Sequence, residues 1–290
     1  MIRLFVSDLD GTLLNEDHVV SEENIKAVEL LRKHGVSFMP ASGRDYLALQ
    51  QAIAPINVRP KCIALNGAQF YDNDGNCLVS NPMSADDVNR VQEVLDEYGL
   101  SPDYYASEGR YVMYDGDDFE GFMRERILSL FHGEKQDNLD EIINNFTKDY
   151  HVETNLTSIL NLEILKIEII CKDAQMKVSL KKALDAMPGI IVTSSHEFNL
   201  EVNASSATKG HAIQQVCDVY GYHPDEVLVV GDGINDIPML KAFTNSYAMG
   251  QASDEVKAVA TYEAASNQED GVAKLIYQVL EANEKERSNE

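Results

Sequence analysis

Apolar runs of strand length alternate with helical patterns at the start of the chain. Residues 4–6 form a short apolar run, and residues 25–31 then repeat apolar positions at helical spacing, with Ser21 as the expected N-cap and Gly35 directly after the last turn. Residues 36–41 form a second apolar run, which another helical pattern follows. Strand and helix in alternation predict a parallel sheet with crossover helices.

The pattern changes from about residue 84 onward. Before this point, we expect a strand at residues 61–65 and a hairpin around Asp74 and Gly75. After it, helices mix with hairpin-like strands, which is typical of an α+β domain. The expected elements are a helix at 84–98, a hairpin around Glu108 and Gly109, helices near 118–131 and 138–149, a strand at 164–171, a helix at 174–187 and a strand at 190–193.

The alternation of strand and helix resumes towards the C-terminus. We therefore predict an α/β core made from both chain ends, residues 1–82 and 197–290, with an α+β domain of residues 83–196 inserted between them. The expected core elements in the second part are a strand at 199–202, a helix at 208–220, a buried strand at 227–230 and a helix at 269–281 followed by a polar tail that frays.

Composition and charge narrow the class of protein. The chain has 290 residues, which agrees with two domains, and 44% of them are hydrophobic, so disorder is excluded as the main state. Its 48 acidic and 24 basic side chains give a net charge of −24. Such a negative surface repels phosphate backbones and anionic lipids, so we expect neither nucleic acid nor a membrane as a partner.

The cysteines and the N-terminus point to the cytoplasm. The four cysteines are scattered without a C-x-x-C pair, which argues against a disulfide framework or a thiolate zinc site. Asp8 interrupts the first apolar run before the core of a signal peptide can develop. No stretch approaches the ~18 apolar residues of a membrane span. We therefore expect a soluble, cytoplasmic protein.

Polar clusters follow three of the expected parallel strands. Because the carboxyl ends of parallel strands meet at one edge of a sheet, these clusters are expected to share one crevice. Lys209 joins them from the start of a helix, where anions are attracted. The clusters are Asp8 and Asp10, then Ser42-Gly43-Arg44, and finally Gly231-Asp232-Gly233-Ile234-Asn235-Asp236.

The chemistry of this crevice points to a metal and a phosphoryl group. Several carboxylates in one place repel each other unless a hard divalent cation with oxygen ligands is present. Mg²⁺ fits because it accepts one or two carboxylates and completes its shell with water and a phosphate oxygen. A metal, a lysine and a hydroxyl together suit a phosphorylated substrate, even on an acidic protein.

These residues resemble the four motifs of the haloacid dehalogenase (HAD) superfamily. The match comprises Asp8-Leu9-Asp10-Gly11-Thr12, Ser42-Gly43-Arg44, Lys209-Gly210 and Gly231 to Asp236. Their order and the long insert are similar to the Cof-like phosphatases with a large type IIB (C2-type) cap, as is Asn66-Gly67-Ala68. The resemblance implies a Rossmann-like core, a cap that selects the substrate, and Mg²⁺ as the cofactor.

The resemblance also implies a role for each residue. Asp8 is the nucleophile that forms an aspartyl phosphate, and Asp10 is the general acid and then the general base. Ser42 and Lys209 hold the phosphoryl oxygens, and Gly43 belongs to the same loop. The expected metal ligands are Asp8, the main-chain carbonyl of Asp10, and Asp232, supported by Asn235 or Asp236.

Other interpretations of single residues remain open. Arg44 either reaches the substrate or is a solvated arginine at a helix start, and Asn66 either lines the site or caps a turn. Lys166 interrupts an apolar strand, for which an exposed strand face is the favoured account over a substrate contact. A dinucleotide-binding loop is excluded, because Asp236 stands where the third glycine of its fingerprint is required.

The residues and the resemblance together predict a Mg²⁺-dependent hydrolase of small phosphomonoesters, and the resemblance implies sugar phosphates or similar small metabolites as its substrates. It acts on a small phosphorylated metabolite as a monomer or a small homo-oligomer. Two alternatives are a phosphomutase that uses the same Asp8 and Asp10 pair, and a non-catalytic protein that senses sugar phosphates. A pure binding protein does not need a nucleophile beside an acid, which argues against the sensor.

Overall fold

The structure is a computed structural model that describes residues 1–130, 143, 147–148, 150–195 and 197–289. The chain forms two compact units. The first consists of Met1–Asn81, Thr193–Glu197 and Asn203–Glu290, and the second of Pro82–Val192 and Phe198–Val202. No helix in the described part of the chain is long and apolar enough to cross a membrane.

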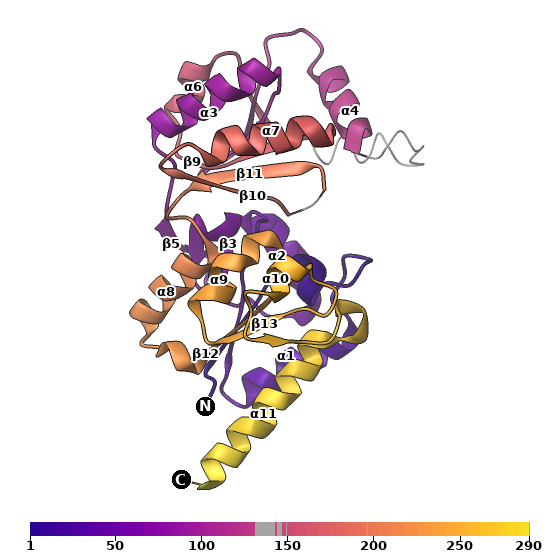
Figure 1. Cartoon of the computed structure of the whole chain (residues 1–290), viewed down its shortest axis with the longest axis vertical. Helices are drawn as coiled ribbons and strands as arrows, with labels where there is room; N and C mark the ends of the chain where they lie inside the picture. The colour runs from indigo at the N-terminus through magenta and orange to yellow at the C-terminus, as the bar shows by residue number, and fades with distance from the viewer. Residues whose placement is uncertain (131–142, 144–146, 149, 196, 290) are drawn as a thin grey trace. The chain divides into compact units, whose positions relative to one another are not determined.

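A parallel five-stranded sheet lies at the centre of the first unit (Figure 1), which confirms the predicted α/β class. The strand order is β14-β13-β12-β1-β2, so the strand that precedes Asp8 lies between the two strands that precede Ser42 and Asp232. The bounds are β1 Leu4–Ser7, β2 Ser37–Pro40, β12 Val227–Gly231, β13 Asn245–Ala248 and β14 Tyr262–Glu263.

Helices cover both faces of this sheet. Phe5 of β1 packs in one apolar cluster with α1 and α11, whereas its neighbours Leu4 and Val6 pack on the opposite face with α8 and α9. Alternate residues of a strand point to opposite faces, so a strand covered on both sides is apolar throughout. The helices are α1 Glu22–Lys33, α2 Tyr46–Ile53, α8 Lys209–Tyr220, α9 Ile237–Ala242, α10 Asp254–Lys257 and α11 Gly271–Asn289.

The first unit also contains a small antiparallel sheet of three strands, β3-β4-β5. Its last two strands form the hairpin that Asp74 and Gly75 predicted. The strands are β3 Cys62–Ala64, β4 Gln69–Tyr71 and β5 Cys77–Ser80, and the short helical turns of the unit are η1 Leu9–Leu13, η2 Ala54–Ile56, η3 Leu65–Gly67, η4 Pro224–Glu226, η5 Ile234–Asp236 and η6 Asn267–Glu269.

The second unit is built on a separate six-stranded sheet of order β10-β11-β9-β6-β7-β8. Strands β11, β9, β6 and β7 pair antiparallel in turn, while β8 runs parallel to β7. Helices α3, α6 and α7 lie together on one side of this sheet (Figure 1). The elements are α3 Ala85–Tyr98, β6 Asp103–Ala106, β7 Gly109–Met113, α4 Phe119–Leu130, β8 Tyr150–Glu153, α6 Leu156–Leu160, β9 Ile164–Ile170, α7 Ala174–Asp185, β10 Ile190–Thr193 and β11 Asn199–Ala204.

Two strand predictions need correction. The strand expected at 199–202 exists as part of β11, but it pairs with β9 in the second sheet instead of continuing the parallel core. Lys166 of β9 was expected on an exposed face, which is wrong: only 3% of its surface is exposed, and Glu201 and Glu168 lie 2.8 and 3.7 Å from its Nζ atom. Two carboxylates compensate the buried ammonium, a condition that strand periodicity does not report.

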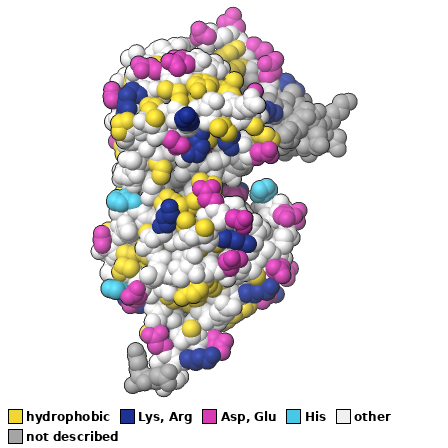
Figure 2. All heavy atoms as spheres, viewed as in Figure 1, with side chains coloured by type: hydrophobic (Ala, Val, Ile, Leu, Met, Phe, Trp, Pro, Cys, Tyr) yellow, Lys and Arg dark blue, Asp and Glu magenta, His cyan; other side chains and the backbone are white. Residues whose placement is uncertain are grey.

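The C-terminal tail does not fray as expected. Helix α11 continues to Asn289, eight residues beyond the predicted end at 281. Its last turns are held by an ion pair between Lys285 and Glu281 at 2.6 Å and by a hydrogen bond of 2.9 Å from the Met1 ammonium to Glu286. The second predicted helix at 138–149 falls mostly outside the described residues. Acidic side chains are scattered over the visible face of each unit, among basic and hydrophobic ones (Figure 2).

Asn24 connects three elements of the core and provides a test of this packing. Its buried amide donates to the carbonyl of Leu13 at 3.0 Å and accepts from the N–H of Ala273 at 2.9 Å. The Asn24→Ala variant leaves both main-chain groups unpaired, so we predict a loss of about 2–4 kcal/mol in unfolding free energy. Chemical denaturation measures it, with Lys26→Ala on the exposed side of α1 as a control expected within about 0.5 kcal/mol. Equal stability of the two variants would contradict this account.

Candidate active site

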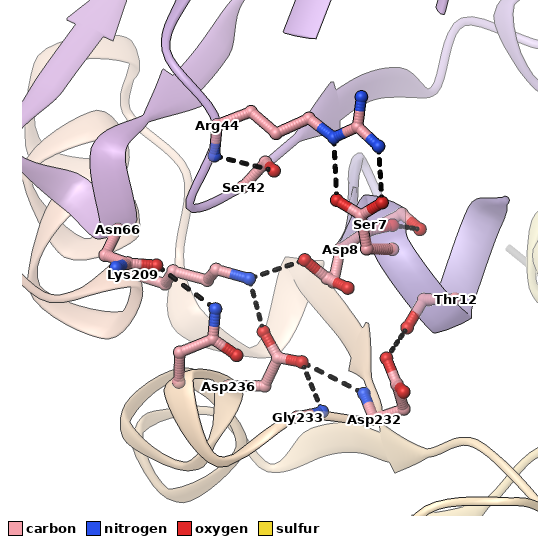
Figure 3. A network of polar contacts seen from close by, with 12 residues as sticks. Ser7, Asp8, Thr12, Ser42, Arg44, Asn66, Lys209, Asp232, Gly233 and Asp236 are labelled. Atoms are coloured by element: carbon pink, nitrogen blue, oxygen red, sulfur yellow. Dashed lines mark hydrogen bonds and ion pairs between the residues drawn. The ribbon is translucent and has the colours of Figure 1, made fainter. Parts of the chain in front are cut away.

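Three loops of the first unit meet at the carboxyl edge of the parallel sheet. Ser7, the last residue of β1, is in register with Val230 of β12 and Pro40 of β2. The residues that follow these strands therefore leave the sheet at one edge, where Figure 3 shows Asp8, Ser42 and Asp232 around one network of contacts. The structure brings together the polar clusters that the sequence predicted to share a crevice.

Lys209 is the centre of this network. Thr208 caps α8 by accepting from the N–H of His211, so the helix begins at Lys209. The Lys209 side chain is completely buried, and its Nζ atom donates to Asp8 Oδ1 and to Asp236 Oδ1, each at 2.6 Å (Figure 3). Burial alone would lower the pKa of this ammonium, but the two carboxylates raise it above its ordinary value, so the lysine remains charged.

The carboxylate of Asp236 is fully engaged. Its Oδ1 atom accepts from Lys209, and its Oδ2 atom accepts from the main-chain N–H groups of Asp232 and Gly233, both at 2.9 Å. Asp8 and Asp232, in contrast, each accept one side-chain hydrogen bond through one oxygen among the described residues, from Lys209 and Thr12 respectively. Asp236 therefore fixes the turn after β12, while the other two carboxylates keep an oxygen for a ligand.

Asp232 is positioned by the loop after β1. Thr12 donates to its Oδ1 atom at 2.8 Å (Figure 3). Gly11 has a φ of +76°, and a Cβ atom built there would lie 2.2 Å from Asp232 Oδ2, so a side chain at this position would be strained and would displace the carboxylate. The roles of Thr12 and Gly11 were missed in the sequence, although both residues stand within the first motif.

The carboxylates fit a divalent cation. Asp8, Asp232 and Asp236 each have an oxygen within 4.8 Å of the others. Burial, and then the charge of Asp236, raise the pKa of Asp8 well above its ordinary value and that of Asp232 to about 6. One lysine thus does not neutralise the cluster, and a donor set of carboxylate oxygens is the kind that hard cations prefer.

Asp10 and Arg44 form a bidentate ion pair. Arg44 donates from Nε to Asp10 Oδ2 at 2.8 Å and from Nη2 to Asp10 Oδ1 at 2.5 Å, and both side chains are partly exposed. Burial alone would raise the pKa of Asp10, but the hydrogen bonds and charge of Arg44 lower it below its ordinary value. Arg44 is therefore partly exposed and has a protein partner, Asp10.

Ser42 and Asn66 are held in the neighbouring loops. The buried Ser42 hydroxyl accepts from the main-chain N–H of Arg44 at 3.2 Å, and Gly43 lies between the two in the same loop. Asn66, with a φ of +60°, accepts from Asn235 at 3.1 Å and donates to Asn203 at 3.2 Å. Asn66 thus lies in a turn and also contacts Asn235, another of the predicted site residues.

Comparison with known proteins assigns the family. A model of haloacid dehalogenase-like hydrolases matches residues 5–276. The chain belongs to this family. A relative, 5-amino-6-(5-phospho-D-ribitylamino)uracil phosphatase YcsE of Bacillus subtilis, is 26% identical over 275 residues, which cover 95% of this chain and 94% of the relative.

Solved structures of this family share the fold. A haloacid dehalogenase-like hydrolase from B. subtilis superposes with a TM-score of 0.79 at 22% identity and covers 95% of this chain and 99% of that chain. The HAD subclass IIB sugar phosphatase BT4131 gives a TM-score of 0.74 at 22% identity, with 96% and 98% covered. The chain is thus an enzyme, a phosphatase of the HAD superfamily, and the resemblance to the Cof-like group is confirmed.

Removal of Lys209 tests the charge balance of the site. In Lys209→Met the buried carboxylates of Asp8 and Asp236 lose their shared cation, so we predict a loss of about 3–5 kcal/mol in unfolding free energy in EDTA at neutral pH. Denaturation curves measure it. The exposed Lys241 on α9 supplies the control, and Lys241→Met is expected to change stability by less than about 0.5 kcal/mol. A variant as stable as this control would refute the central role of Lys209.

Proposed function

We propose that the protein is a Mg²⁺-dependent hydrolase of small phosphomonoesters that works through an aspartyl phosphate on Asp8. The observation that carries this proposal is the contact of 2.6 Å between Lys209 Nζ and Asp8 Oδ1, beside Asp232. A carboxylate next to a buried cation and a metal-binding carboxylate is equipped to approach an anionic phosphoryl group, which repels a carboxylate alone. The family supports the same chemistry.

The reaction has two steps. A carboxylate oxygen of Asp8 attacks the phosphorus, the bond from phosphorus to the ester oxygen breaks, and the leaving alcohol takes a proton from Asp10. A water molecule, whose proton Asp10 removes, then attacks the phosphorus of the aspartyl phosphate, and phosphate leaves Asp8 with its carboxylate restored. Ser42 and Lys209 hold the phosphoryl oxygens during both transfers.

Asp8 and Asp232 are the residues that we propose as carboxylate ligands of Mg²⁺, with the main-chain carbonyl of Asp10 and, through their contacts, Asn235 and Asp236 in support. When bound, the ion neutralises charge on the phosphoryl oxygens and on the carboxylates. The raised pKa values of Asp8 and Asp232 support this assignment, because excess negative charge at the site favours a cation.

The ion pair between Arg44 and Asp10 adds a requirement to this mechanism. Asp10 cannot give a proton while Arg44 holds it in the ionised form. We propose that Arg44 leaves Asp10 for an anionic oxygen of the substrate, which its planar guanidinium binds with similar geometry. Asp10 then turns to the leaving group only when substrate is present.

The proposed substrates are sugar phosphates and related phosphates of polyhydroxy chains. The YcsE relative is named for a phosphoribityl substrate, and BT4131 is called a sugar phosphatase. We propose that the second unit, expected at residues 83–196, acts as the cap that selects the alcohol part. The cytoplasmic location and a monomer or small homo-oligomer remain predictions.

Phosphate release from a panel of sugar phosphates and ribityl phosphates tests the nucleophile. Asp8→Asn is expected to lower the rate by at least ~10³-fold, because an amide is a poor nucleophile. Asp17→Asn, an exposed aspartate beyond the same loop, serves as the control and should retain full activity. Turnover that needs a bisphosphate activator and releases no phosphate would identify the phosphomutase. Binding without turnover would identify the sensor.

The stability of the metal-free protein is predicted to depend on pH. A carboxyl group whose folded pKa is raised destabilises the protein as pH rises through that value. In EDTA the melting temperature should therefore fall between about pH 4 and pH 6, through the window set by Asp232. Mg²⁺ should restore stability at pH 8 more than at pH 5, since its ligands must be deprotonated.

Thermal melts with EDTA or MgCl₂ at the two pH values measure this effect. Asp232→Asn removes a proposed ligand and should abolish the stabilisation by Mg²⁺, while Asp17→Asn should keep it. A melting temperature of the wild type that Mg²⁺ leaves unchanged at pH 8 would contradict the metal assignment.

A further inference from the structure

The first unit has a cavity of about 270 Å³ beside the amino ends of β1 and β2. Leu4 and Ser37, the first residues of these strands, line it. The candidate active site follows the opposite, carboxyl ends of the same strands, at Asp8 and Ser42. A strand of four residues spans ~13 Å, so the cavity is separate from the active site.

Three basic residues are among those that line the cavity: Arg32, Arg59 and Lys61. Its lining contains no aspartate or glutamate, although the chain has twice as many acidic as basic residues, 48 against 24. Within the described ranges, no carboxylate forms an ion pair with any of these three cations. The described residues that line the cavity therefore carry a net positive charge, although the whole protein is negative.

Two of the cations are held in place by neutral contacts. Arg59 donates from Nη1 to the main-chain carbonyl of Asp74 at 3.4 Å, and the amide of Asn73 donates to the Arg59 carbonyl at 2.9 Å. Lys61 Nζ lies 3.6 Å from the centre of the Tyr220 ring. Contacts of this kind orient a cation without cancelling its charge, so both side chains stay available to an anion.

The rest of the lining adds neutral donors and an apolar wall. The hydroxyls of Ser37 and Tyr222 lie 3.0 Å apart at the cavity, and Phe38 and Val58 contribute apolar surface. Burial lowers the pKa of Lys61, a loss of hydration that a bound anion would offset. Charged donors next to apolar surface are typical of sites for small organic anions, and the volume lies near the lower end for ligand pockets.

We propose that this cavity binds a small phosphate-bearing metabolite at a second site, distinct from the active site. A phosphate monoester carries about −1.5 to −2 charges at pH 7. This charge balances three cations better than the single negative charge of a carboxylate does. Arg32 and Arg59 carry guanidinium groups, whose paired N–H donors suit phosphate oxygens. The apolar wall at Phe38 accommodates the body of the metabolite. This proposal is independent of the reaction at Asp8.

Calorimetric titration of the full chain with inorganic pyrophosphate in EDTA, which prevents turnover, tests the proposal. We expect Arg32→Gln/Lys61→Gln to bind pyrophosphate at least about tenfold more weakly than the wild type. The matched control is Lys26→Gln/Lys33→Gln, which also removes two positive charges, both from α1 and both outside the cavity lining. This control should bind pyrophosphate with an affinity within about twofold of that of the wild type.

Two further measurements separate the cavity from the active site and from misfolding. Ser42→Ala changes the active-site loop and should leave intact the binding of pyrophosphate that depends on Arg32 and Lys61. The ligand-free melting temperatures of both double variants should lie near that of the wild type, and Arg59→Gln repeats the test if one of them does not fold. The proposal is overturned if the wild type binds no pyrophosphate, if both double variants weaken binding equally, or if only Ser42→Ala weakens it.

Discussion

The arrangement of the site depends on one buried ammonium between two carboxylates. Asp8 and Asp236 leave different strand ends of the sheet, and each would carry a large desolvation cost as an unpaired anion. Lys209, at the first residue of α8, satisfies both at 2.6 Å. Because it compensates them together, the loops after β1 and β12 are held to the start of one helix.

Close main-chain packing makes this contact possible. A Cβ atom at Gly67 would lie 2.3 Å from the carbonyl oxygen of Thr208, so the turn after β3 rests directly on the cap of α8. The Gly11 backbone approaches the carboxylate of Asp232 in the same way. Small residues at these points let charged side chains from three loops share one volume, which larger residues would push apart.

The overall charge of the protein is negative, but basic residues gather at particular places. Acidic side chains are scattered over the visible surface (Figure 2), and the net charge of −24 is far from neutrality. Lys209 and Arg44 are paired with carboxylates at one edge of the sheet, whereas the residues around Lys61 at the other edge are basic without a carboxylate in the described lining. Screening limits each field to roughly 10 Å, so such local concentrations act independently of the overall charge.

The sequence by itself determined the α/β class, most of the helices and strands, and the set of polar residues at the strand ends. These follow from local periodicity, capping residues and motifs, all of which act between residues close in the chain. The Asp8 and Asp232 clusters were predictable because parallel strands end at one edge of a sheet whatever their order.

Only the tertiary structure decided which groups became partners. The periodicity of 199–202 is that of a strand, but its pairing with β9 depends on contacts distant in sequence. The ion pair between Arg44 and Asp10 and the burial of Lys166 arise in the same way. A residue pattern indicates how strongly a side chain favours burial. The partner of that side chain is set by the packing of the whole chain, because packing determines which charges must compensate each other.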